Sequence, residues 1–385
     1  MIQKISIKNY KSIQSLPDFE LKPINVLIGA NNSGKSNFLD VFAFLRDTLQ
    51  DGSSHGSHEN KVTGGWRGAL KKRGGGESVC FSYEQHFQIS CLSYPFKYSL
   101  EIALDQFGQY YQIRDERLTA VNAEKKFFEP QNGMLAIYDE SGNRLNASAR
   151  GERTGLGEFL SQRRGDQQAL DFARKLSEIR IYDRIHTEIW SPIRIPKVSK
   201  GETILDEDGD NLVGVLHQLS QTQPNFLPEL NSLLKILYRD FAGISFPHNQ
   251  QGEILIRWEE TNGRVANVSQ LSDGTLKFLC LIAIFKNPNP PALAGIDEVD
   301  ANLHPKMQVI LADIIDEASQ RMQIIATTHN PDFVSMFTPD EIVIMQQYMG
   351  ATEMRRFSSK GALELWLEHF TTRKLWLMGE LESRW

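Results

Sequence analysis

The chain has 385 residues, of which 41% are hydrophobic and 23% charged, an ordinary composition for a globular protein. This length favours a principal domain with a large insertion over one compact core. No apolar run approaches the roughly 20 residues that a membrane helix needs, and the N-terminus lacks an apolar signal segment, so we expect a cytoplasmic protein with no membrane partner. The net charge of −6 excludes a global attraction to nucleic acid, but not a local basic groove.

Neither the cysteines nor the basic clusters predict a site. Cys80, Cys91 and Cys280 are odd in number and lack the spacing of metal ligands, so we expect free thiols in a reducing compartment. The visible basic clusters, at residues 71–73 and 163–164, are interpreted as solvated loop charge.

The first 76 residues predict a strand, a second strand, a helix and a loop. Residues 2–8 alternate between isoleucine and polar side chains, as in a half-buried strand. A buried strand is expected over 24–28 and a helix over 35–49, where the apolar residues fall on one face. Residues 51–76 are rich in glycine, serine and histidine and predict a loop.

The residue pattern changes twice in the middle of the chain. Aromatic and β-branched residues increase over 79–145, with a turn at 141–143, which predicts an antiparallel β arm. Helical patterns follow around 167–180 and 211–241. Residues 254–263 then predict a hairpin that turns at an Asn-Gly pair.

Strands and helices alternate again toward the C-terminus. The expected elements are a helix over 275–286, a strand over 292–296, a helix over 305–319 and a strand over 322–327. This pattern predicts an α/β nucleotide-binding core that the middle region splits. The expected divisions are 1–50 for the N-terminal part of the core, 51–165 for the loop and β arm, 166–262 for a helical insertion, and 263–385 for the C-terminal part of the core.

Residues 29–36 read Gly-Ala-Asn-Asn-Ser-Gly-Lys-Ser and match the phosphate-loop pattern G-x-x-x-x-G-K-[ST]. Glycines let the backbone amides face a phosphate, and the following helix N-terminus adds positive potential. We expect Lys35 to reach the β- and γ-phosphates of ATP, and Ser36 to ligate Mg²⁺. The residues predicted to bind ATP here are Gly29, Asn31, Asn32, Ser33, Gly34, Lys35, Ser36 and Asn37.

Two acids follow the apolar strand over 292–296. A carboxylate at the end of a buried strand can hold Mg²⁺, which is the role expected for Asp297. The next acid, Glu298, is the candidate general base that polarises the attacking water. Such a pair is common after apolar runs and predicts a site only in combination with the phosphate loop.

Two further elements come in the order that nucleotide chemistry requires. His329 follows the apolar strand over 322–327 and is a candidate hydrogen-bond donor to the γ-phosphate. Residues 271–275, Leu-Ser-Asp-Gly-Thr, precede an apolar helix, where Ser272 and the amide of Gly274 can bind phosphate oxygens. Alone, this pentapeptide indicates no more than a helix cap.

Together these residues resemble the ATPases of the ABC/SMC/RecF group. Residues 7–12, Ile-Lys-Asn-Tyr-Lys-Ser, resemble the opening strand of the SMC/RecF proteins, and residues 29–36 look like Walker A. Residues 271–275 resemble the ABC signature, with Asp273 and Thr275 in place of the usual glycine and glutamine. The resemblance implies a P-loop NTPase of ABC/RecF type, with a mixed-sheet core, an antiparallel β arm and a helical insertion.

The C-terminal motifs extend this likeness. Asp297 and Glu298 look like Walker B and its catalytic acid, and His329 looks like the switch histidine. Residues 300–305, Asp-Ala-Asn-Leu-His-Pro, are similar to the D-loop segment of RecF-like and OLD-type ATPases.

A closer likeness is to stand-alone bacterial AAA-type ATPases of RecF/ABC type. These share an Arg-Gly-Gly at 73–75, an Asp-Gly-x-Asn-Leu at 208–212 and a Gly-Glu-Leu at 379–381. Two features depart from the pattern. Val299 replaces the usual proline, and the Q-loop glutamine is unassigned, with Gln85 and Gln88 as candidates. No aromatic residue is assigned to the adenine.

In the ABC class, the signature loop of one subunit completes the Walker A site of the other. The resemblance therefore implies a head-to-tail homodimer that sandwiches two ATP molecules, with Ser272 and Gly274 acting in trans. ATP binding would join the copies and hydrolysis would release them. Because residues 50–262 lack heptad repeats, no long coiled coil is expected in this output region.

Three outputs remain open. The first is a DNA-related ATPase in repair or anti-phage defence, working with a separate effector such as a nuclease. The second is a regulatory or scaffolding ATPase that acts only on protein partners. The third, an ABC transporter subunit, is disfavoured because the insertion and the Leu-His-Pro segment belong to the RecF/OLD side. About 55 residues follow His329, too few for a Toprim domain, so no intrinsic nuclease is expected.

Overall fold

The structure is a computed structural model, and it describes most of the chain. The described residues are 1–49, 69–70, 73, 86–104, 111–121, 125–131, 134–149, 154–163, 165–198, 200–357, 361 and 363. Several sequence features lie outside them: most of the 51–76 loop, Cys80, Gln85, the basic residues 71, 72 and 164, and the motif at 379–381. Within the described part, no helix is both long enough and apolar enough to cross a membrane.

A six-stranded sheet forms the centre of the fold, in the order β10-β14-β15-β3-β16-β17. Its strands are β3 (Ile24–Ile28), β10 (Arg180–Tyr182), β14 (Leu293–Ile296), β15 (Gln323–Thr327), β16 (Ile342–Tyr348) and β17 (Ala351–Arg356). The first five strands in this order run parallel, and β17 is antiparallel to β16. The loops that follow β3, β14 and β15 therefore meet at one edge of the sheet.

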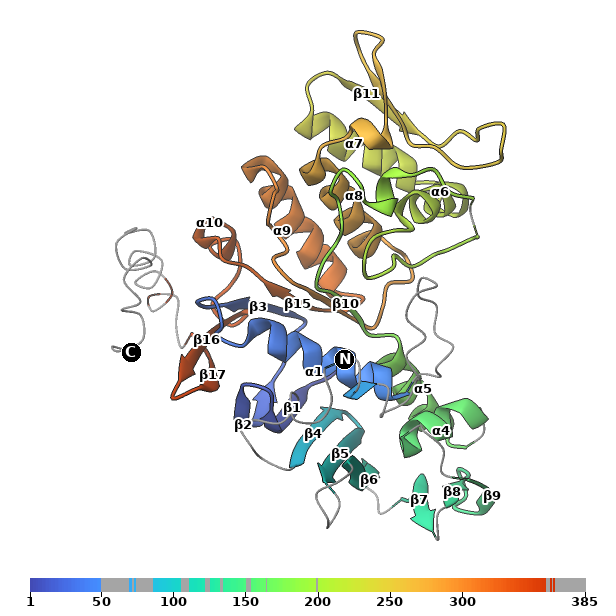
Figure 1. The fold of residues 1–385 in the computed structure, drawn as a ribbon, viewed down its shortest axis with the longest axis vertical. Helices are drawn as coiled ribbons and strands as arrows, with labels where there is room; N and C mark the ends of the chain where they lie inside the picture. The colour runs from blue at the N-terminus through green and yellow to red at the C-terminus, as the bar shows by residue number, and fades with distance from the viewer. Residues whose placement is uncertain are drawn as a thin grey trace.

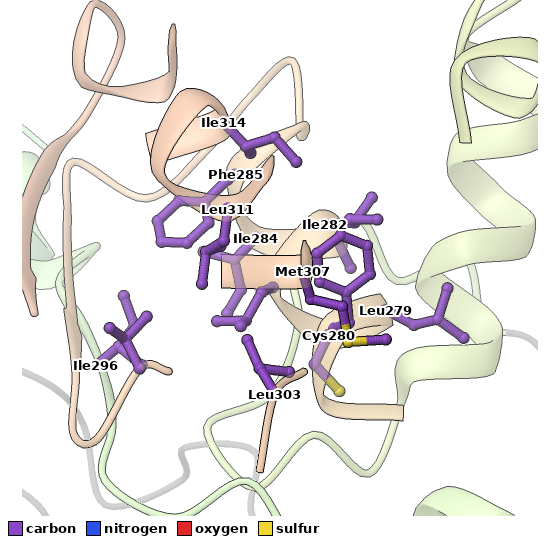
Figure 2. Close-up of a cluster of buried hydrophobic side chains, with 14 of the residues drawn as sticks. Leu279, Cys280, Ile282, Ile284, Phe285, Ile296, Leu303, Met307, Leu311 and Ile314 are labelled. Atoms are coloured by element: carbon purple, nitrogen blue, oxygen red, sulfur yellow. The ribbon is translucent and has the colours of Figure 1, made fainter. Parts of the chain in front are cut away.

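Helices cover both faces of this sheet (Figure 1). They are α1 (Lys35–Leu49), α4 (Gly155–Gln162) and α5 (Gln167–Ser177) on one side, and α8 (Asp273–Phe285) and α9 (Pro305–Ser319) on the other. Strand β3 serves both cores because its side chains alternate: Ile24, Val26 and Ile28 join the cluster of α8 and α9, and Leu27 joins that of α1. Figure 2 shows part of the first cluster, where Ile296 of β14 lies below Leu311 of α9.

The predicted antiparallel arm is present as a five-stranded sheet in the order β2-β1-β4-β5-β6. Its strands are β1 (Lys4–Tyr10), β2 (Ile13–Glu20), β4 (His86–Ser93), β5 (Phe96–Leu104) and β6 (Tyr111–Ala120). A three-stranded sheet follows, of β7 (Phe128–Gln131), β8 (Met134–Tyr138) and β9 (Arg144–Ala149). Residues 1–50 are expected in the core, and the structure pairs β3 with β15 but also β1 with β4, so this stretch supplies strands to both sheets.

The insertion between β10 and α8 consists of short elements. They are η1 (Pro192–Arg194), α6 (Leu212–Thr222), α7 (Phe226–Leu237), β11 (Phe241–Ser245), β12 (Arg257–Glu260), β13 (Val265–Asn267) and η2 (Val268–Gln270). The helix expected over 211–241 is two helices because Pro224 lies between them and cannot donate a helical hydrogen bond. The expected hairpin is formed by β12 and β13 around Gly263, whose φ is 83°.

The helix expected over 167–180 ends earlier, at Ser177 of α5. The next residues form β10, which joins the central sheet in parallel with β14. The side chains of Ile181 and Tyr182 are buried there, so packing against the sheet prevails over the helical pattern. Strand β10 thus brings residues of the expected insertion into the central sheet.

Candidate active site

The loop between β3 and α1 is packed tightly and depends on its glycines. Gly34 has a φ of 98°, and a Cβ there would lie 2.1 Å from Oγ1 of Thr352 in β17. A Cβ on Gly29 would lie 2.1 Å from the carbonyl oxygen of Met345 in β16. Asn32 has a φ of 66°, a left-handed conformation that asparagine tolerates. Strands β16 and β17 therefore fix the shape of the loop.

Lys35, the first residue of α1, lies against this loop. Its Nζ donates hydrogen bonds of 2.9 Å to the carbonyl oxygens of both Gly29 and Ala30. Burial lowers the pKa of Lys35, while the carboxylates of Asp297 and Glu298 favour its charged form. A partly desolvated cation binds an anion more strongly than a hydrated one, so this position suits a phosphate group.

Ser36 and Asp297 are in direct contact. The Ser36 hydroxyl donates a hydrogen bond of 2.8 Å to Oδ2 of Asp297, and the hydroxyl of Thr327 donates to Oδ1. The three residues meet because β14 and β15 are adjacent parallel strands that end beside the start of α1.

The oxygen atoms of Ser36 and Asp297 fit a magnesium ion. Hydroxyl and carboxylate oxygens are hard ligands, and Mg²⁺ commonly takes one or two protein ligands and fills the rest of its octahedron with water and phosphate oxygens. No group of three or more histidine, cysteine, aspartate or glutamate side chains in the described ranges could hold a metal ion. Phosphate oxygens and water would complete the coordination of such an ion.

Glu298 has a left-handed backbone conformation, with a φ of 47°, and its side chain is exposed. Its N–H donates a hydrogen bond of 2.7 Å to Oγ1 of Thr327. The next N–H, that of Val299, donates to the Thr327 carbonyl oxygen at 3.0 Å. A proline at position 299 could not make this bond, so valine there supports the strained acid.

His329 follows β15 at the same edge of the sheet and is half-buried. Its pKa is lowered by burial and then by the charge of Lys35, while Glu298 and Asp297 act in the opposite direction. The lowered pKa favours the neutral imidazole, in which one ring nitrogen can donate a hydrogen bond.

Ser272 and Gly274 lie at the start of α8. Ser272 caps this helix, since its Oγ accepts the N–H of Thr275 at 3.2 Å. A Cβ on Gly274 would lie 2.4 Å from the carbonyl oxygen of Asn302. Residues 271–275, the signature segment, therefore pack directly on the segment after β14. In the part of the chain that the structure describes, no hydrogen bond joins Ser272 or Gly274 to the 29–36 loop.

The buried Arg194 holds the signature segment in place, a role that the sequence does not indicate. Its guanidinium donates to the carbonyl oxygens of Thr187, Glu188, Ser269 and Leu271 and to Oδ1 of Asp273, over 2.6–3.1 Å. Each of these hydrogen bonds ends on a backbone carbonyl oxygen or on a carboxylate oxygen. Arg194 therefore links the segment at 187–188 to the signature segment.

Asn37 supports the phosphate loop through the turn between β1 and β2. Its Nδ2 donates 2.7 Å to Oγ of Ser12, which lies 2.8 Å from Oγ1 of Thr352. The Thr352 hydroxyl also donates to the carbonyl oxygen of Ser33, at 3.1 Å. Asn31, by contrast, is exposed at the loop surface. Ser12 ends the 7–12 motif, whereas Thr352 carries no sequence signal.

Gln88 lies in β4, opposite Lys8 of β1. It is thus part of the arm sheet, and no described hydrogen bond links it to the phosphate loop. Gln85 lies outside the described residues. The residue that would sense a γ-phosphate in place of the Q-loop glutamine stays unassigned.

Two of the weaker motifs have structural explanations. Arg73 is buried against α1, with Nε 2.8 Å from Asp40 and Nη1 3.1 Å from Asp47. In the 208–212 motif, Gly209 has a φ of 81°, and the Asn211 side chain bonds two backbone groups of the preceding turn. Both motifs stabilise local structure.

A sequence profile of one protein family matches residues 24–335. The family is described as "AAA domain, putative AbiEii toxin, Type IV TA system". None of the curated protein sequences compared with the chain matches it.

The solved structures similar to this chain include two Smc heads. An Smc head bound to the C-winged helix domain of ScpA is 15% identical, with a TM-score of 0.53, and the match covers 94% of this chain and 99% of that one. An Smc head domain with an extended coiled coil, bound to the C-terminal domain of ScpA and derived from Pyrococcus furiosus, is 14% identical, with a TM-score of 0.50, and the match covers 96% and 99%. At these identities the likeness is one of fold. It confirms the predicted α/β P-loop fold of ABC/RecF type.

Proposed function

Because the chain belongs to the AAA-domain family whose profile spans residues 24–335, we propose that it is a Mg²⁺-dependent ATPase that binds ATP between two copies of itself. The observation that carries the proposal is the contact between Ser36 and Asp297, with Lys35 against the same loop. Two hard oxygen ligands and a desolvated cation are the groups that a magnesium nucleotide requires.

Each residue of this cluster has a role in the proposal. The amides of the 29–36 loop and Lys35 bind the phosphates. Ser36 and Asp297 would hold Mg²⁺, which neutralises phosphate charge when bound. Glu298 takes a proton from the attacking water, because it is the exposed carboxylate next to the metal ligand. His329 donates a hydrogen bond to the γ-phosphate from its neutral ring.

The position of the signature segment supports the proposed dimer. Ser272 and Gly274 present a helix N-terminus, a group that binds anions, and among the described residues no hydrogen bond joins them to the phosphate loop of their own chain. A symmetric head-to-tail pair would bring each signature segment to the other copy's nucleotide. The nucleotide then becomes part of the interface, and its hydrolysis opens the pair.

The output belongs to the same proposal. The Smc heads of similar fold are each bound to a partner protein, ScpA. For this chain we favour a cytoplasmic, DNA-related ATPase in repair or anti-phage defence, with a separate effector protein that supplies any nuclease activity. The alternative is a regulatory ATPase whose partners are proteins only. DNA stimulation of ATPase turnover distinguishes the two.

The test measures ATPase turnover and oligomer mass for wild type and Glu298→Gln, with and without duplex DNA. We expect Glu298→Gln to bind ATP, to dimerise more persistently and to turn over about 10²- to 10⁴-fold more slowly, because it lacks the base. Lys35→Ala should lose ATP binding. Glu229→Gln, on the exposed side of α7, is the matched control. Unchanged turnover in Glu298→Gln would reject the base, and wild type without turnover would reject the ATPase.

A further inference from the structure

The backbone of Glu298 is held from both sides. Its N–H donates to Thr327 Oγ1 at 2.7 Å, and its carbonyl oxygen accepts a hydrogen bond of 2.6 Å from Nζ of Lys277 in α8. The N–H of Ala301 also donates to this carbonyl, at 3.1 Å. A φ of 47° is unfavourable for glutamate, so surrounding contacts must maintain the conformation. Lys277 is the side chain of α8 that contacts this backbone directly.

Two opposing effects act on the pKa of Lys277. Burial is the larger effect and lowers its pKa, while Asp300, Glu298 and Asp297 each favour the charged form. The side chain is half-buried, and its ammonium bonds a backbone oxygen in the middle of this acidic group. A charged donor makes a stronger hydrogen bond to a carbonyl than a neutral one. This hydrogen bond therefore joins α8 to the segment that contains Glu298.

A second contact joins the same two segments. Gly274 lies so close to Asn302 that a Cβ would come within 2.4 Å of the Asn302 carbonyl oxygen. Asn302 is itself in a left-handed conformation, with a φ of 63°. Behind these contacts, α8 packs on α9 and on Leu303 in the apolar cluster of Figure 2. Helix α8 thus contacts both ends of the 298–303 segment.

Lys277 lies five positions after Ser272 on the same helix. Ser272 would contact the nucleotide of the other copy, whereas Glu298 would act on the nucleotide of its own copy. A shift of α8 when its N-terminus engages the partner's phosphates would therefore move Nζ of Lys277 relative to the Glu298 carbonyl. Packed interiors transmit such shifts because they have few voids.

We infer that Lys277 is a positioning residue that fixes the backbone of Glu298. Through this contact, Lys277 couples ATP hydrolysis in one copy to the engagement of that copy's α8 with the other copy. This inference rests on the proposed ATPase and dimer. As a positioning residue Lys277 would act through the Glu298 backbone, so its loss should slow turnover and leave ATP affinity unchanged. A displacement of a catalytic group by about 1 Å costs about 100-fold in rate.

The experiment compares the kcat and KM of full-length wild type, Lys277→Met and Lys277→Arg. Methionine keeps the length and removes the donor, while arginine keeps a charged donor. We expect kcat to fall about 10- to 100-fold in Lys277→Met, with KM within about twofold, and to recover at least partly in Lys277→Arg. Lys286→Met is the matched control, because Lys286 ends the same helix and contacts Glu317 instead. It should leave kcat unchanged.

A double mutant separates positioning from general loss of structure. If Lys277 acts through Glu298, Lys277→Met should slow Glu298→Gln by less than about twofold. Additive losses, or a kcat within about twofold of wild type in Lys277→Met, would overturn the inference. If Lys277→Met does not fold, Lys277→Gln, whose shorter side chain cannot reach as far, takes its place with the same expected loss.

The outcomes for the proposed function stay distinguishable. Wild type without ATPase activity, or Glu298→Gln with full activity, would reject the proposed function together with this inference. A wild type that depends on Glu298 but not on Lys277 would reject the inference alone.

Discussion

The hydroxyl of Ser36 donates a hydrogen bond of 2.8 Å to Oδ2 of Asp297, although 261 positions separate the two residues in the sequence. The contact joins the first turn of α1 to the end of β14. The hydroxyl of Thr327, at the end of β15, donates to the other oxygen of the same carboxylate. Asp297 is thus oriented by two hydroxyls before any metal binds, and pre-oriented ligands bind a metal more tightly.

Asp297→Asn should weaken magnesium binding and spare nucleotide binding in the absence of magnesium. The amide removes the negative charge and presents an N–H₂ group that repels a cation. We expect the magnesium concentration for half-maximal turnover to rise about 10- to 100-fold. A magnesium titration of ATPase activity at fixed ATP measures this. Asp313→Asn, on the exposed face of α9, should behave as wild type. The same magnesium dependence in both variants would remove Asp297 from the metal site.

Much of the central fold could be predicted because its signals are local. The helices at 35–49 and 305–319 have the predicted bounds, since their apolar faces are continuous and each follows a clear helix start. Strand β3 is apolar at four of its five positions and is followed by the phosphate loop, which identifies both. The residues brought together at Ser36 and Asp297 also follow from the rule that parallel strands end at one edge.

The supporting residues could not be predicted, because their partners are distant in sequence. Thr352 supports the phosphate loop from 319 positions away, and Arg194 bonds the signature segment from 75–79 positions away. A threonine in a strand and an arginine in a loop are common, and nothing local marks these two. The strand at 180–182 was missed for a related reason. It has three residues and continues an amphipathic pattern, and only pairing with β14 determines its conformation.

Arg194→Met should destabilise the fold and prevent ATP-dependent dimerisation. The substitution leaves the buried carbonyl oxygens that Arg194 binds without their donor, and each such loss is unfavourable. We expect the free energy of unfolding to fall by about 2–4 kcal/mol, measured by urea denaturation. The phosphate loop is elsewhere in the fold, so the folded variant should still bind ATP.

The control for Arg194 is Arg257→Met. Arg257 is half exposed and pairs with the exposed Glu259, so its loss should change stability by less than about 1 kcal/mol. Equal stability losses in the two variants would show that Arg194 has no special structural role. Dimerisation of Arg194→Met at wild-type ATP concentrations would show that the signature segment does not need this anchor.

His217 of α6 should make the protein more sensitive to acid. Its ring centroid lies 5.2 Å from that of His248, and its Nδ1 has no hydrogen-bond partner within the described ranges. Burial is the first cause of its lowered pKa, and His248 adds to the effect. As the pH falls below 6.5, the unfolded chain therefore takes up the proton first, and the folded state loses stability. The stabilising contribution of neutral His217 is complete above pH 6.5. It is lost progressively as the pH falls from there to the lower pKa of the folded state.

Thermal unfolding from about pH 7.5 to about pH 5.5 tests this sign. The Tm of wild type should fall further over this range than that of His217→Gln, because glutamine does not titrate. Gln218→Asn, at the next position of α6, is the control, because it changes no titratable group. Its Tm should fall with pH in parallel with that of wild type, even if the substitution lowers the Tm at every pH. A His217→Gln profile parallel to wild type would mean that the folded state accepts the proton on His217 as readily as the unfolded chain does.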